Sequence, residues 1–456
     1  MSASREWAGR RVLVVGLGVS GFAAARALVE LDAKVRVTEG SSDKAIESRA
    51  SLLRDMGADV EIGGHDLTAL DADVAVVSPG IPPTAEVVET LRRQSARLMS
   101  EVELAYQLAR CDFLAVTGTN GKTTTTSLLA SMLDRGGIPS AAAGNIGDPL
   151  VDAALSIPDG GAIAVEVSSF QLATIERFRP KVAVVLNVAE DHTDWHGSVV
   201  RYAAAKARIF ENQTADDVVV INADDPGAAT LMEGVASRLV PFSARRVPPR
   251  GAGVQGEDIV VLGDRVAGLA DVRLPGSAGR EDSVAAAAAA ALYGVEPAAI
   301  SSALRSFRPL AHRLQPVGTF EGVDYIDDSK ATNPHATVSA LQGMTDVVLI
   351  AGGRSKGIDL SPLGGIAQGV RAVIALGEAR DDLVRVLGDL VEVIPVDSMR
   401  DAVRLARVKA DGRGSVLLSP ACASLDMYSN YAARGKEFAN EVRALANQER
   451  SEDGHS

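Results

Sequence analysis

Short runs of consecutive apolar and β-branched residues recur along the chain and alternate with longer stretches of helical periodicity. In the first segment the runs are RVLVVG at 11–16, KVRVTE at 34–39 and VAVVSPG at 74–80, and the Ala-rich stretch FAAARALVELDA follows the first of them. Runs of this length are typical of strands that are buried on both faces of a parallel sheet. The pattern therefore predicts a βαβ succession, which we assign to residues 1–108.

The same alternation continues through two further segments. Strands are predicted at FLAVTG, AIAVEVSS, VAVVLNV and VVVINAD in residues 109–307, and at VDYID, VVLIAGG, AVIALG and SVLLSP in residues 308–456. Residues 240–275 are rich in Gly and Pro and predict a small antiparallel addition. We expect a three-domain α/β protein: a Rossmann-like N-terminal domain, a central P-loop ATPase-like domain with a mainly parallel sheet, and a Rossmann-like C-terminal domain.

Composition and charge narrow the class of protein. The formal net charge of -13 over 456 residues disfavours binding to nucleic-acid phosphates. The two cysteines, Cys111 and Cys422, exclude a disulfide scaffold and suit a reducing cytoplasm. The N-terminus lacks a secretory apolar core, and no apolar run is long enough to cross a bilayer. We expect a cytoplasmic monomer that acts on small molecules, with no nucleic-acid partner and no membrane span.

The run FLAVTG leads into a glycine-containing loop and then into a stretch of helical pattern at 123–135. A loop in this position binds phosphates through converging backbone N–H groups, with a lysine for the outer phosphates and a hydroxyl group for Mg²⁺. The full Walker pattern would have glycine where this chain has Val116, so a glycine turn with a capping threonine is the alternative. The strand–loop–helix context favours ATP, and the candidate ligands are Gly118, Thr119, Asn120, Gly121, Lys122, Thr123 and Thr124.

A second glycine loop follows the first predicted strand. Gly16, Gly18 and Gly21 form GxGxxG, and Glu39 ends the next predicted strand. This is the dinucleotide fingerprint, in which the acidic residue binds a ribose hydroxyl. The same loop can hold another pyrophosphate or form only a tight turn, so NAD(P) is one of three interpretations.

Two predicted strand ends in the central segment carry acidic and imidazole groups. Glu166 ends AIAVE, and His192 lies in the motif EDH after VAVVLNV. Ligands gather at the carboxyl ends of strands in open α/β sheets. Carboxylate, imidazole and the hydroxyl group of Thr123 together suit Mg²⁺, whereas a polar strand-end loop is the alternative for His192.

Lys206 lies on a predicted helix, RYAAAKARIFEN, between Tyr202 and Phe210 at the spacing i, i+4, i+8. A lysine framed by two aromatic rings is partly desolvated, which lowers its pKa and leaves more neutral amine. A neutral amine can take up CO₂ and become a carbamate. The alternative is a lysine whose stem covers an apolar face while its ammonium group reaches water.

Polar residues follow the predicted strands of the third segment as IDDSKATNP, AGGRSKG and SPACASLD. They include Asp328, Lys330, Lys356 and Ser424. Because parallel strands end at the same edge of a sheet, all of them could face one cleft. Taken singly, each could also be an ordinary turn residue.

The combination of GTNGKTTT, GNIG, EVSSFQL, EDH, AAK, HR, DDSKATNP, AGGRSKG and SPACASLD resembles the Mur ligases. The motifs run from Gly16 to Tyr431 and so cover nearly the whole chain. DDSKATNP with SPACASLD is similar to the members that add D-glutamate to UDP-N-acetylmuramoyl-L-alanine in peptidoglycan precursor synthesis. The resemblance implies that ATP phosphorylates the terminal carboxylate of that substrate, and that the amine of D-glutamate attacks the acyl phosphate.

The resemblance also implies site residues. Lys122, Glu166, His192 and Lys206 would be catalytic, with one Mg²⁺ on Thr123 and Glu166 and a second on His192 and a carbamylated Lys206. Besides the phosphate loop, the residues implied for ATP are Asp282, Arg313, Asp328 and Lys330. The residues implied for the UDP-linked substrate are Val19, Ser20, Glu39, Ser78, Gly80 and Asn145. Those implied for D-glutamate are His192, Thr332, Lys356, Ser424 and Tyr431.

The chain departs from the family pattern at three places. Tyr431 stands where the family has phenylalanine, Glu39-Gly40 stands where an aspartate-threonine pair meets the uracil, and Asp282 stands for an asparagine near the adenine. The alternatives to a D-glutamate ligase are a sister ligase for another amino acid, a folate-polyglutamylating relative, an NAD(P)-dependent dehydrogenase or redox sensor, and a non-catalytic nucleotide switch.

Overall fold

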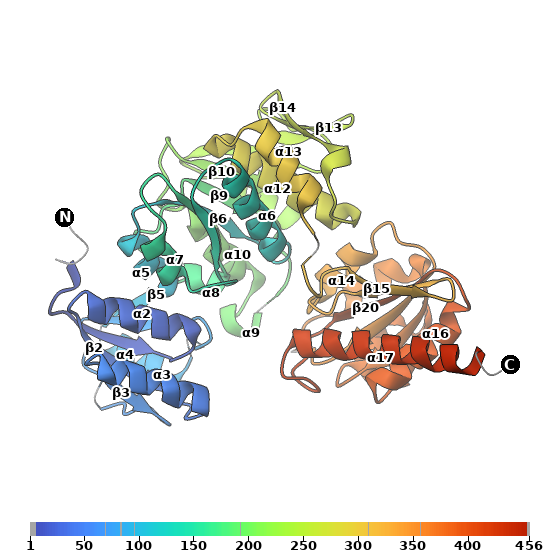
Figure 1. The fold of residues 1–456 in the computed structure, drawn as a ribbon, viewed down its shortest axis with the longest axis horizontal. Coiled ribbons are helices and arrows are strands. Elements are labelled where there is room, and N and C mark those ends of the chain that lie inside the picture. The colour runs from blue at the N-terminus through green and yellow to red at the C-terminus, as the bar shows by residue number, and fades with distance from the viewer. Residues whose placement is uncertain are drawn as a thin grey trace. The chain divides into compact units, whose positions relative to one another are not determined.

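The computed structural model describes residues 6–68, 70–82, 84–94, 96–191, 193–308, 310–355 and 357–453. The chain forms two units that are described separately. The first comprises Met1–Val188, Trp195–Asp271 and Asp282–Ser306, and the second comprises Ala189–Asp194, Val272–Glu281 and Phe307–Ser456. Two sheets lie in the first unit and one in the second (Figure 1).

The N-terminal sheet is parallel and has the strand order β3-β2-β1-β4-β5. Its strands are β1 Arg11–Val15, β2 Lys34–Glu39, β3 Asp59–Ile62, β4 Val74–Val77 and β5 Arg97–Ser100. Its helices are α2 Val19–Glu30, α3 Lys44–Asp55, α4 Glu86–Arg93 and α5 Glu101–Leu108. Val12 and Val14 belong to the same buried cluster as residues of α2 and α3, whereas Leu13 and Val15 belong to the cluster of α4. This two-sided burial explains the unbroken apolar run of β1.

The central sheet has nine strands in the order β14-β13-β12-β11-β10-β9-β6-β8-β7. They are β6 Asp112–Thr117, β7 Ser140–Gly144, β8 Ala162–Glu166, β9 Val182–Val185, β10 Val218–Asn222, β11 Arg238–Ser243, β12 Ala252–Gln255, β13 Asp258–Val261 and β14 Asp264–Gly268. The pairs β12–β13 and β13–β14 are antiparallel, and the other pairs are parallel. The predicted antiparallel addition is therefore confirmed.

The helices of the central segment are α6 Lys122–Arg135, α7 Leu150–Ser156, α8 Ser169–Leu172, α9 Thr193–His196, α10 Val199–Ala207, α11 Pro226–Ala229, α12 Gly276–Tyr293 and α13 Pro297–Ser306. Three short 3₁₀ turns add η1 Arg208–Phe210, η2 Thr230–Met232 and η3 Leu269–Asp271. The alanine run at 285–291 lies inside α12, and Ala285 to Ala290 are completely buried. Small side chains here allow the helix to pack closely.

A buried carboxylate joins the two sheets of the first unit. Glu103 on α5 has no exposed surface, and its carboxylate oxygens accept hydrogen bonds from the backbone N–H groups of Glu176, Arg177 and Phe178 at 2.8 to 3.0 Å. Gln107 donates a further bond at 2.7 Å. Glu103 thus satisfies the donors of a central-segment loop from a helix of the N-terminal segment.

The third sheet has the order β15-β16-β20-β17-β18-β19, and only the edge pair β15–β16 is antiparallel. Its strands are β15 Gln315–Phe320, β16 Val323–Asp327, β17 Val347–Gly352, β18 Val370–Leu376, β19 Glu392–Val396 and β20 Ser415–Ala421. The helical segments are α14 Pro334–Leu341, η4 Ser361–Gly369, α15 Arg380–Leu387, α16 Met399–Ala410 and α17 Tyr431–Asp453. Buried clusters on both faces of the sheet show that this is the predicted doubly wound unit.

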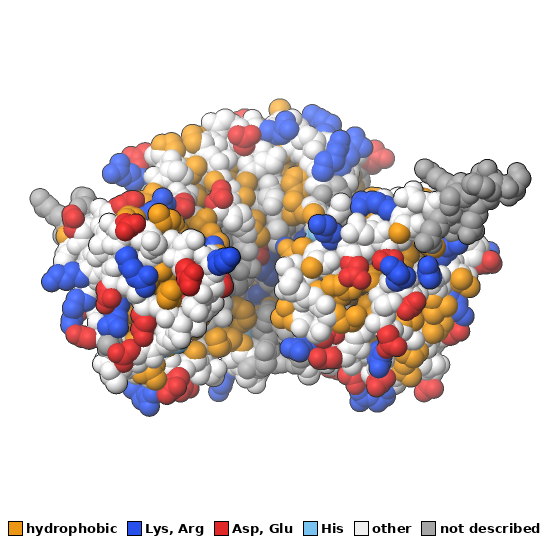
Figure 2. Space-filling view, turned by 60° about the horizontal axis from the view of Figure 1, so that its bottom comes forward, with side chains coloured by type: hydrophobic (Ala, Val, Ile, Leu, Met, Phe, Trp, Pro, Cys, Tyr) orange, Lys and Arg blue, Asp and Glu red, His pale blue; other side chains and the backbone are white. Residues whose placement is uncertain are grey.

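On the face shown in Figure 2, acidic and basic side chains are interspersed over the surface. Within the part of the chain that the structure describes, no helix combines the length and the apolar character needed to span a membrane.

Candidate active site

The phosphate loop joins β6 to α6 as predicted. Gly121 precedes α6 with a φ of 83°, in the left-handed region that glycine adopts without strain. A Cβ atom at this position would also lie 2.2 Å from Oδ1 of Asp282. A side chain at this position would be strained, and the carboxylate of Asp282 lies against the loop that was predicted to bind phosphates.

Asn187, which the sequence analysis did not select, holds this loop. Its carbonyl oxygen accepts from the N–H group of Thr119 at 2.9 Å, and its side-chain Oδ1 accepts from the N–H group of Asn120 at 2.7 Å. Its Nδ2 donates to the carbonyl oxygen of Asn120 at 3.2 Å. The available signal was a polar residue directly after the apolar run VAVVL, where a parallel strand ends.

Two lysines converge on one carbonyl oxygen of the loop. Lys122 Nζ donates to the carbonyl oxygens of Gly118 and Thr119, both at 2.9 Å. Lys206 Nζ donates to the same carbonyl oxygen of Gly118 at 2.7 Å. Lys206 and the phosphate loop are therefore in direct contact.

Lys206 is 1% exposed, so its ammonium group does not reach water and the alternative of a solvent-reaching lysine is wrong. Its Nζ lies 4.4 Å from the ring centroid of Tyr202, and the hydroxyl group of Tyr202 is 3.2 Å from Oγ1 of Thr119. The helix α10 ends at Ala207, and Phe210 lies in the 3₁₀ turn that follows. The predicted continuous helix through Phe210 is therefore wrong, because the chain tightens to three residues per turn there.

Glu166 ends β8, as expected, and is 3% exposed. Its Oε1 accepts from Asn145 Nδ2 at 3.0 Å, and its carbonyl oxygen accepts from the N–H group of Asn145, also at 3.0 Å. Its other carboxylate oxygen, Oε2, is buried and has no hydrogen-bond partner among the described residues. A buried carboxylate oxygen without a donor suits a hard cation such as Mg²⁺.

Thr123, the second predicted ligand of that cation, is 8% exposed at the start of α6. Among the described residues, no group of three or more His, Cys, Asp or Glu side chains is arranged to hold a metal ion. His192, predicted for the second cation and for D-glutamate, lies outside the described residues.

The N-terminal glycine loop is tightly closed. A Cβ atom on Gly21 would lie 1.9 Å from the carbonyl oxygen of Gly16, so α2 packs directly on the loop. Ser78 Oγ donates to the same carbonyl oxygen at 3.3 Å. Val19 is 57% exposed, and Ser20 is half-buried in the first turn of α2. The exposed Gly80 lies two residues beyond Ser78.

The carboxylate of Glu39 binds backbone N–H groups of nearby loops. Its Oε2 accepts from the N–H group of Leu17 at 2.6 Å, and its Oε1 accepts from the N–H group of Ser41 at 2.8 Å. In the dinucleotide interpretation this carboxylate would instead bind a ribose hydroxyl. Its engagement with two backbone donors argues against that interpretation.

Asp328 lies in the second unit, directly after β16, and is 8% exposed. Its carboxylate accepts from Ser419 Oγ at 2.9 Å and from the N–H group of Leu314 at 3.2 Å. Burial raises the pKa of Asp328 from 3.8 to about 7, and the hydrogen bond from Ser419 and the charge of Arg313 oppose that rise. Ser419 itself lies inside β20, so the expectation that it sits in a strand-end loop is wrong.

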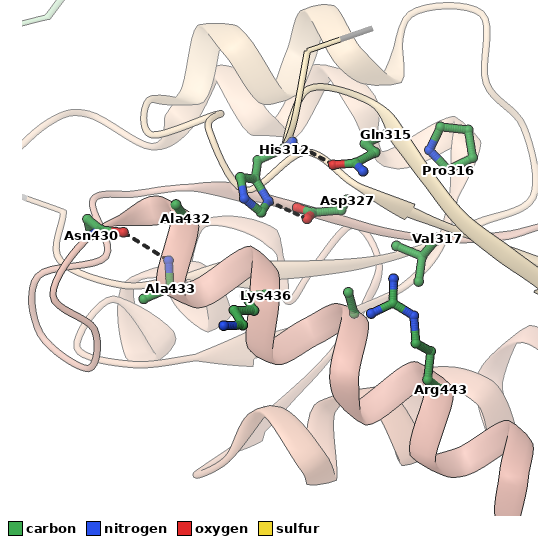
Figure 3. Close-up of a pocket in the computed structure, with 11 residues that line it drawn as sticks. His312, Gln315, Pro316, Val317, Asp327, Asn430, Ala432, Ala433, Lys436 and Arg443 are labelled. Atoms are coloured by element: carbon green, nitrogen blue, oxygen red, sulfur yellow. Dashed lines mark hydrogen bonds and ion pairs between the residues drawn. The ribbon is translucent and has the colours of Figure 1, made fainter.

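Next to Asp328, Asp327 pairs with His312, whose Nδ1 lies 2.7 Å from Oδ2 of the carboxylate. The two side chains border a cavity of about 440 Å³ between β15 and α17, into which Lys436 and Arg443 of α17 also face (Figure 3). Lys330 donates its N–H group to the carbonyl oxygen of His312 at 3.1 Å. A Cβ atom on Gly435 of α17 would lie 2.6 Å from Oδ2 of Asp327, so the end of β16 lies directly beside the start of α17.

Three of the residues predicted for D-glutamate, Thr332, Ser424 and Tyr431, lie at the carboxyl edge of the third sheet. Thr332 is half-buried in the loop after β16, and Ser424 is 3% exposed after β20. Tyr431 begins α17, with its ring centroid 5.3 Å from Nζ of Lys330. Lys356, the fourth candidate besides His192, lies outside the described residues.

Three family models match the chain. They are the MurD-like N-terminal domain of Mur ligases at residues 10–100, the Mur ligase middle domain at 116–248 and the glutamate ligase domain of Mur ligases at 312–422. Proteins of Frankia casuarinae and Geobacillus kaustophilus, both named UDP-N-acetylmuramoylalanine–D-glutamate ligase, are similar to it. The first is 44% identical, covering 97% of this chain and 96% of the relative, and the second is 42% identical, covering 98% and 100%.

Solved structures share the fold. The UDP-N-acetylmuramate–alanine ligase of Thermotoga maritima has a TM-score of 0.60 at 18% identity and covers 96% of this chain and 100% of that one. MurF from Acinetobacter baumannii has a TM-score of 0.61 at 14% identity and covers 97% and 93%.

Together, the three matched Mur ligase domains, the phosphate loop and the buried carboxylate of Glu166 define the class of ATP-dependent ligases. Within this class, the chain belongs to the Mur ligase family. This membership decides against the dehydrogenase and nucleotide-switch alternatives.

Proposed function

We propose that the chain catalyses the ATP-dependent addition of D-glutamate to UDP-N-acetylmuramoyl-L-alanine, in the cytoplasmic synthesis of the peptidoglycan precursor. The observation that carries the proposal is the phosphate loop with Lys122, Lys206 and Glu166 around it, in a chain that is 44% identical to a protein named for this reaction. In the proposed reaction, the substrate carboxylate takes the γ-phosphoryl group of ATP and forms an acyl phosphate. The amine of D-glutamate then attacks the acyl carbon, and phosphate leaves.

Phosphoryl transfer requires mainly positioning and neutralisation of charge. In our proposal the loop residues Gly118 to Thr124 surround the ATP phosphates with N–H groups, and Lys122 moves from its contacts with Gly118 and Thr119 to the outer phosphates. Asp282, Arg313, Asp328 and Lys330 complete the ATP contacts. The position of Asp282 beside Gly121 supports its part in this set.

Two Mg²⁺ sites belong to the proposal. Thr123 and Glu166 would hold one ion, and the buried Oε2 of Glu166 supports this assignment. His192 and a carbamylated Lys206 would hold the second. When bound, such ions stabilise the negative charge that develops on the transferred phosphoryl group and the acyl oxygen.

Carbamylation of Lys206 joins its neutral amine to the carbon of CO₂ and releases one proton. The complete burial of Nζ against Tyr202 supports this step, because desolvation favours the neutral amine. The product is a carboxylate on a long stem, which gives the phosphate loop an additional oxygen ligand for a cation.

The UDP-linked substrate is assigned to Val19, Ser20, Glu39, Ser78, Gly80 and Asn145. Asn145 connects this set to the cation site, because its side chain donates to the carboxylate of Glu166. D-Glutamate is assigned to His192, Thr332, Lys356, Ser424 and Tyr431. The ring of Tyr431, proposed for D-glutamate, lies beside Lys330, proposed for ATP. This contact supports binding of both ligands at the same edge of the third sheet.

We further propose domain bounds of 1–108, 109–307 and 308–456, a monomeric state and no nucleic-acid partner. The three separate sheets and the spread of the family matches support the bounds. The net charge of -13 and the interspersed surface charges of Figure 2 support the absence of a nucleic-acid partner.

The test is a phosphate-release assay with UDP-N-acetylmuramoyl-L-alanine and Mg-ATP across a panel of D- and L-amino acids. We expect release only when D-glutamate completes the mixture. Equal or faster release with L-glutamate or another amino acid would refute the D-glutamate assignment. Lys122→Ala serves as the control for the phosphate loop, since it should abolish release with every amino acid.

A further inference from the structure

Arg434 lies in the first turns of α17 and is 2% exposed, which makes it one of the largest completely buried side chains in the described part of the molecule. Its guanidinium group makes four hydrogen bonds within the second unit. Nε donates to Ser329 Oγ at 3.0 Å, and Nη2 donates to the carbonyl oxygen of Ser329 at 2.9 Å. Nη1 donates to the carbonyl oxygens of Cys422 at 3.1 Å and Gly352 at 3.3 Å.

These three partners come from three strand ends. Ser329 follows β16, Cys422 follows β20, and Gly352 is the last residue of β17. The strands β16, β20 and β17 are neighbours in the sheet, so their carboxyl ends form one continuous edge. A single planar fork of N–H donors therefore fixes the spacing of three adjacent loops.

The same loops carry the amino-acid candidates. Thr332 lies three residues after Ser329, and Ser424 lies two residues after Cys422. The start of α17, which carries the candidate Tyr431, is joined to these loops as well, because Ser329 Oγ donates to the carbonyl oxygen of Tyr431 at 2.8 Å. One guanidinium group thus contacts, directly or through one hydroxyl group, the backbone of every described segment that holds a proposed D-glutamate residue.

The backbone around Arg434 leaves little room for adjustment. A Cβ atom on Gly353 would lie 2.2 Å from the carbonyl oxygen of Ala423 and 3.1 Å from Nη1 of Arg434. A Cβ atom on Gly435 would lie 2.3 Å from Nδ1 of His312. The loops after β17 and β20 are therefore packed directly against each other and against the guanidinium group.

The chemistry of this burial points to function rather than to stability. All the hydrogen-bond partners are carbonyl or hydroxyl oxygens, and none is a carboxylate. Burial lowers the pKa of Arg434 to about 10 and the nearby charges of Asp426 and Asp327 oppose that shift, so the group still carries its charge at neutral pH. A buried cation whose hydrogen-bond partners are all neutral is costly to maintain, and apolar residues often fill such a volume with equal or better stability.

We propose that Arg434 is a positioning residue that sets the geometry of the D-glutamate site by holding the three loops after β16, β17 and β20 and the start of α17. The proposal rests on the proposed function, which assigns D-glutamate to these loops. Arg434 acts through the residues it holds, since its donors are occupied by backbone and hydroxyl oxygens.

The test compares Arg434→Lys and Arg434→Met with the wild-type protein by steady-state phosphate release, with each of the three substrates varied in turn. Lysine keeps the positive charge but loses the planar set of N–H donors. Methionine keeps much of the side-chain volume but has neither the charge nor the donors. We expect the KM for D-glutamate to rise by roughly tenfold or more in both variants, because a displacement of about 1 Å at a binding residue has effects of this size. The KM for UDP-N-acetylmuramoyl-L-alanine should change by less than about threefold, since its proposed residues lie in the first unit.

Arg385→Met is the matched control, because Arg385 is an exposed arginine on α15 of the same unit. It should leave all three KM values unchanged. Ser329→Ala is a milder variant for the case in which both Arg434 variants fail to fold, and it removes the hydroxyl group between Nε and Tyr431. We expect a several-fold rise of the KM for D-glutamate in this variant too.

The role is refuted if the variants that fold keep the wild-type KM for D-glutamate, or if all three KM values rise together. It is also refuted if only the melting temperature falls. The wild-type protein is assayed in parallel on the amino-acid panel. This assay separates failure of the role proposed for Arg434 from failure of the proposed function. If the wild type prefers another amino acid, the D-glutamate assignment fails, and the variants then report whether Arg434 positions the amino acid that is used.

Discussion

At the scale of single residues, a local sequence pattern identified Lys206 as a candidate catalytic residue but did not predict which residues it contacts. Two aromatic residues frame Lys206 at helical spacing in the sequence, and in the structure the ring of Tyr202 lies against its ammonium group. Its hydrogen bond to Gly118 crosses 88 positions of sequence. Spacing along one helix reports neighbours on that helix, whereas the contact with the loop depends on where the fold of the first unit places α10.

Lys206→Ala should abolish turnover. Loss of a carbamate that binds a cation removes several kcal/mol of transition-state stabilisation, and each ~1.4 kcal/mol corresponds to a tenfold change in rate. We expect a loss of more than about a hundredfold in kcat, measured by phosphate release. Added carbonate together with a short carboxylic acid should partly restore the Ala variant. Lys44→Ala, at an exposed lysine, is the control, and full activity of Lys206→Ala would rule out the carbamate.

Asp328 provides a prediction of pH dependence. Because burial raises its pKa from 3.8 to about 7, the folded state binds the proton more tightly than the unfolded state does. The free energy of unfolding therefore falls as pH rises between these two values, by up to about 1.4 kcal/mol per pH unit from this group.

Asp328→Asn removes that contribution and keeps a side-chain oxygen that can accept from Ser419. The variant should gain in unfolding free energy relative to the wild type as pH rises from about 5 to 7, which urea denaturation at several pH values measures. A difference between the two proteins that stays constant over this range would show that Asp328 titrates at its ordinary pKa in the folded state.

At the scale of elements, burial on both faces decided which strands could be predicted. The strands β1, β6, β8 and β17 are interior strands of parallel sheets and read as continuous apolar runs. The strands that were not predicted include β3, β5, β7, β15 and β19, and each of them is the edge strand of its sheet. An edge strand has fewer buried positions, and its sequence resembles that of a loop.

The helix α5 supplies a prediction at this scale. Glu103→Ala leaves the N–H groups of Glu176, Arg177 and Phe178 without their acceptor. Each buried donor without a partner costs about 1 to 3 kcal/mol, so we expect the apparent stability of the first unit to fall by roughly 3 kcal/mol. Thermal denaturation measures this, and Glu89→Ala on the exposed face of α4 should have no effect. An unchanged transition in Glu103→Ala would mean that water replaces the carboxylate without loss.

At the scale of the whole molecule, the two units have separate cores. The buried clusters of the first unit contain residues of β1 and β6, and those of the second contain residues of β16 to β18 and β20. Units with independent cores commonly unfold independently.

We therefore expect two transitions in differential scanning calorimetry. UDP-N-acetylmuramoyl-L-alanine should raise only one of them, because its proposed residues all lie in the first unit. At about 100 times its Kd, a ligand adds about 2.7 kcal/mol of stability, enough for a shift of several degrees. A single transition, or an equal shift of both, would contradict this picture.

The sequence by itself determined the α/β class, the interior strands and the phosphate loop, because each of these is encoded in a local pattern. Tertiary structure decided how distant segments meet. Asn187 holds the phosphate loop, and Arg434 binds Ser329 across 105 positions of sequence. Neither contact follows from periodicity or a motif, since the position of each partner depends on which strands lie side by side in the sheet.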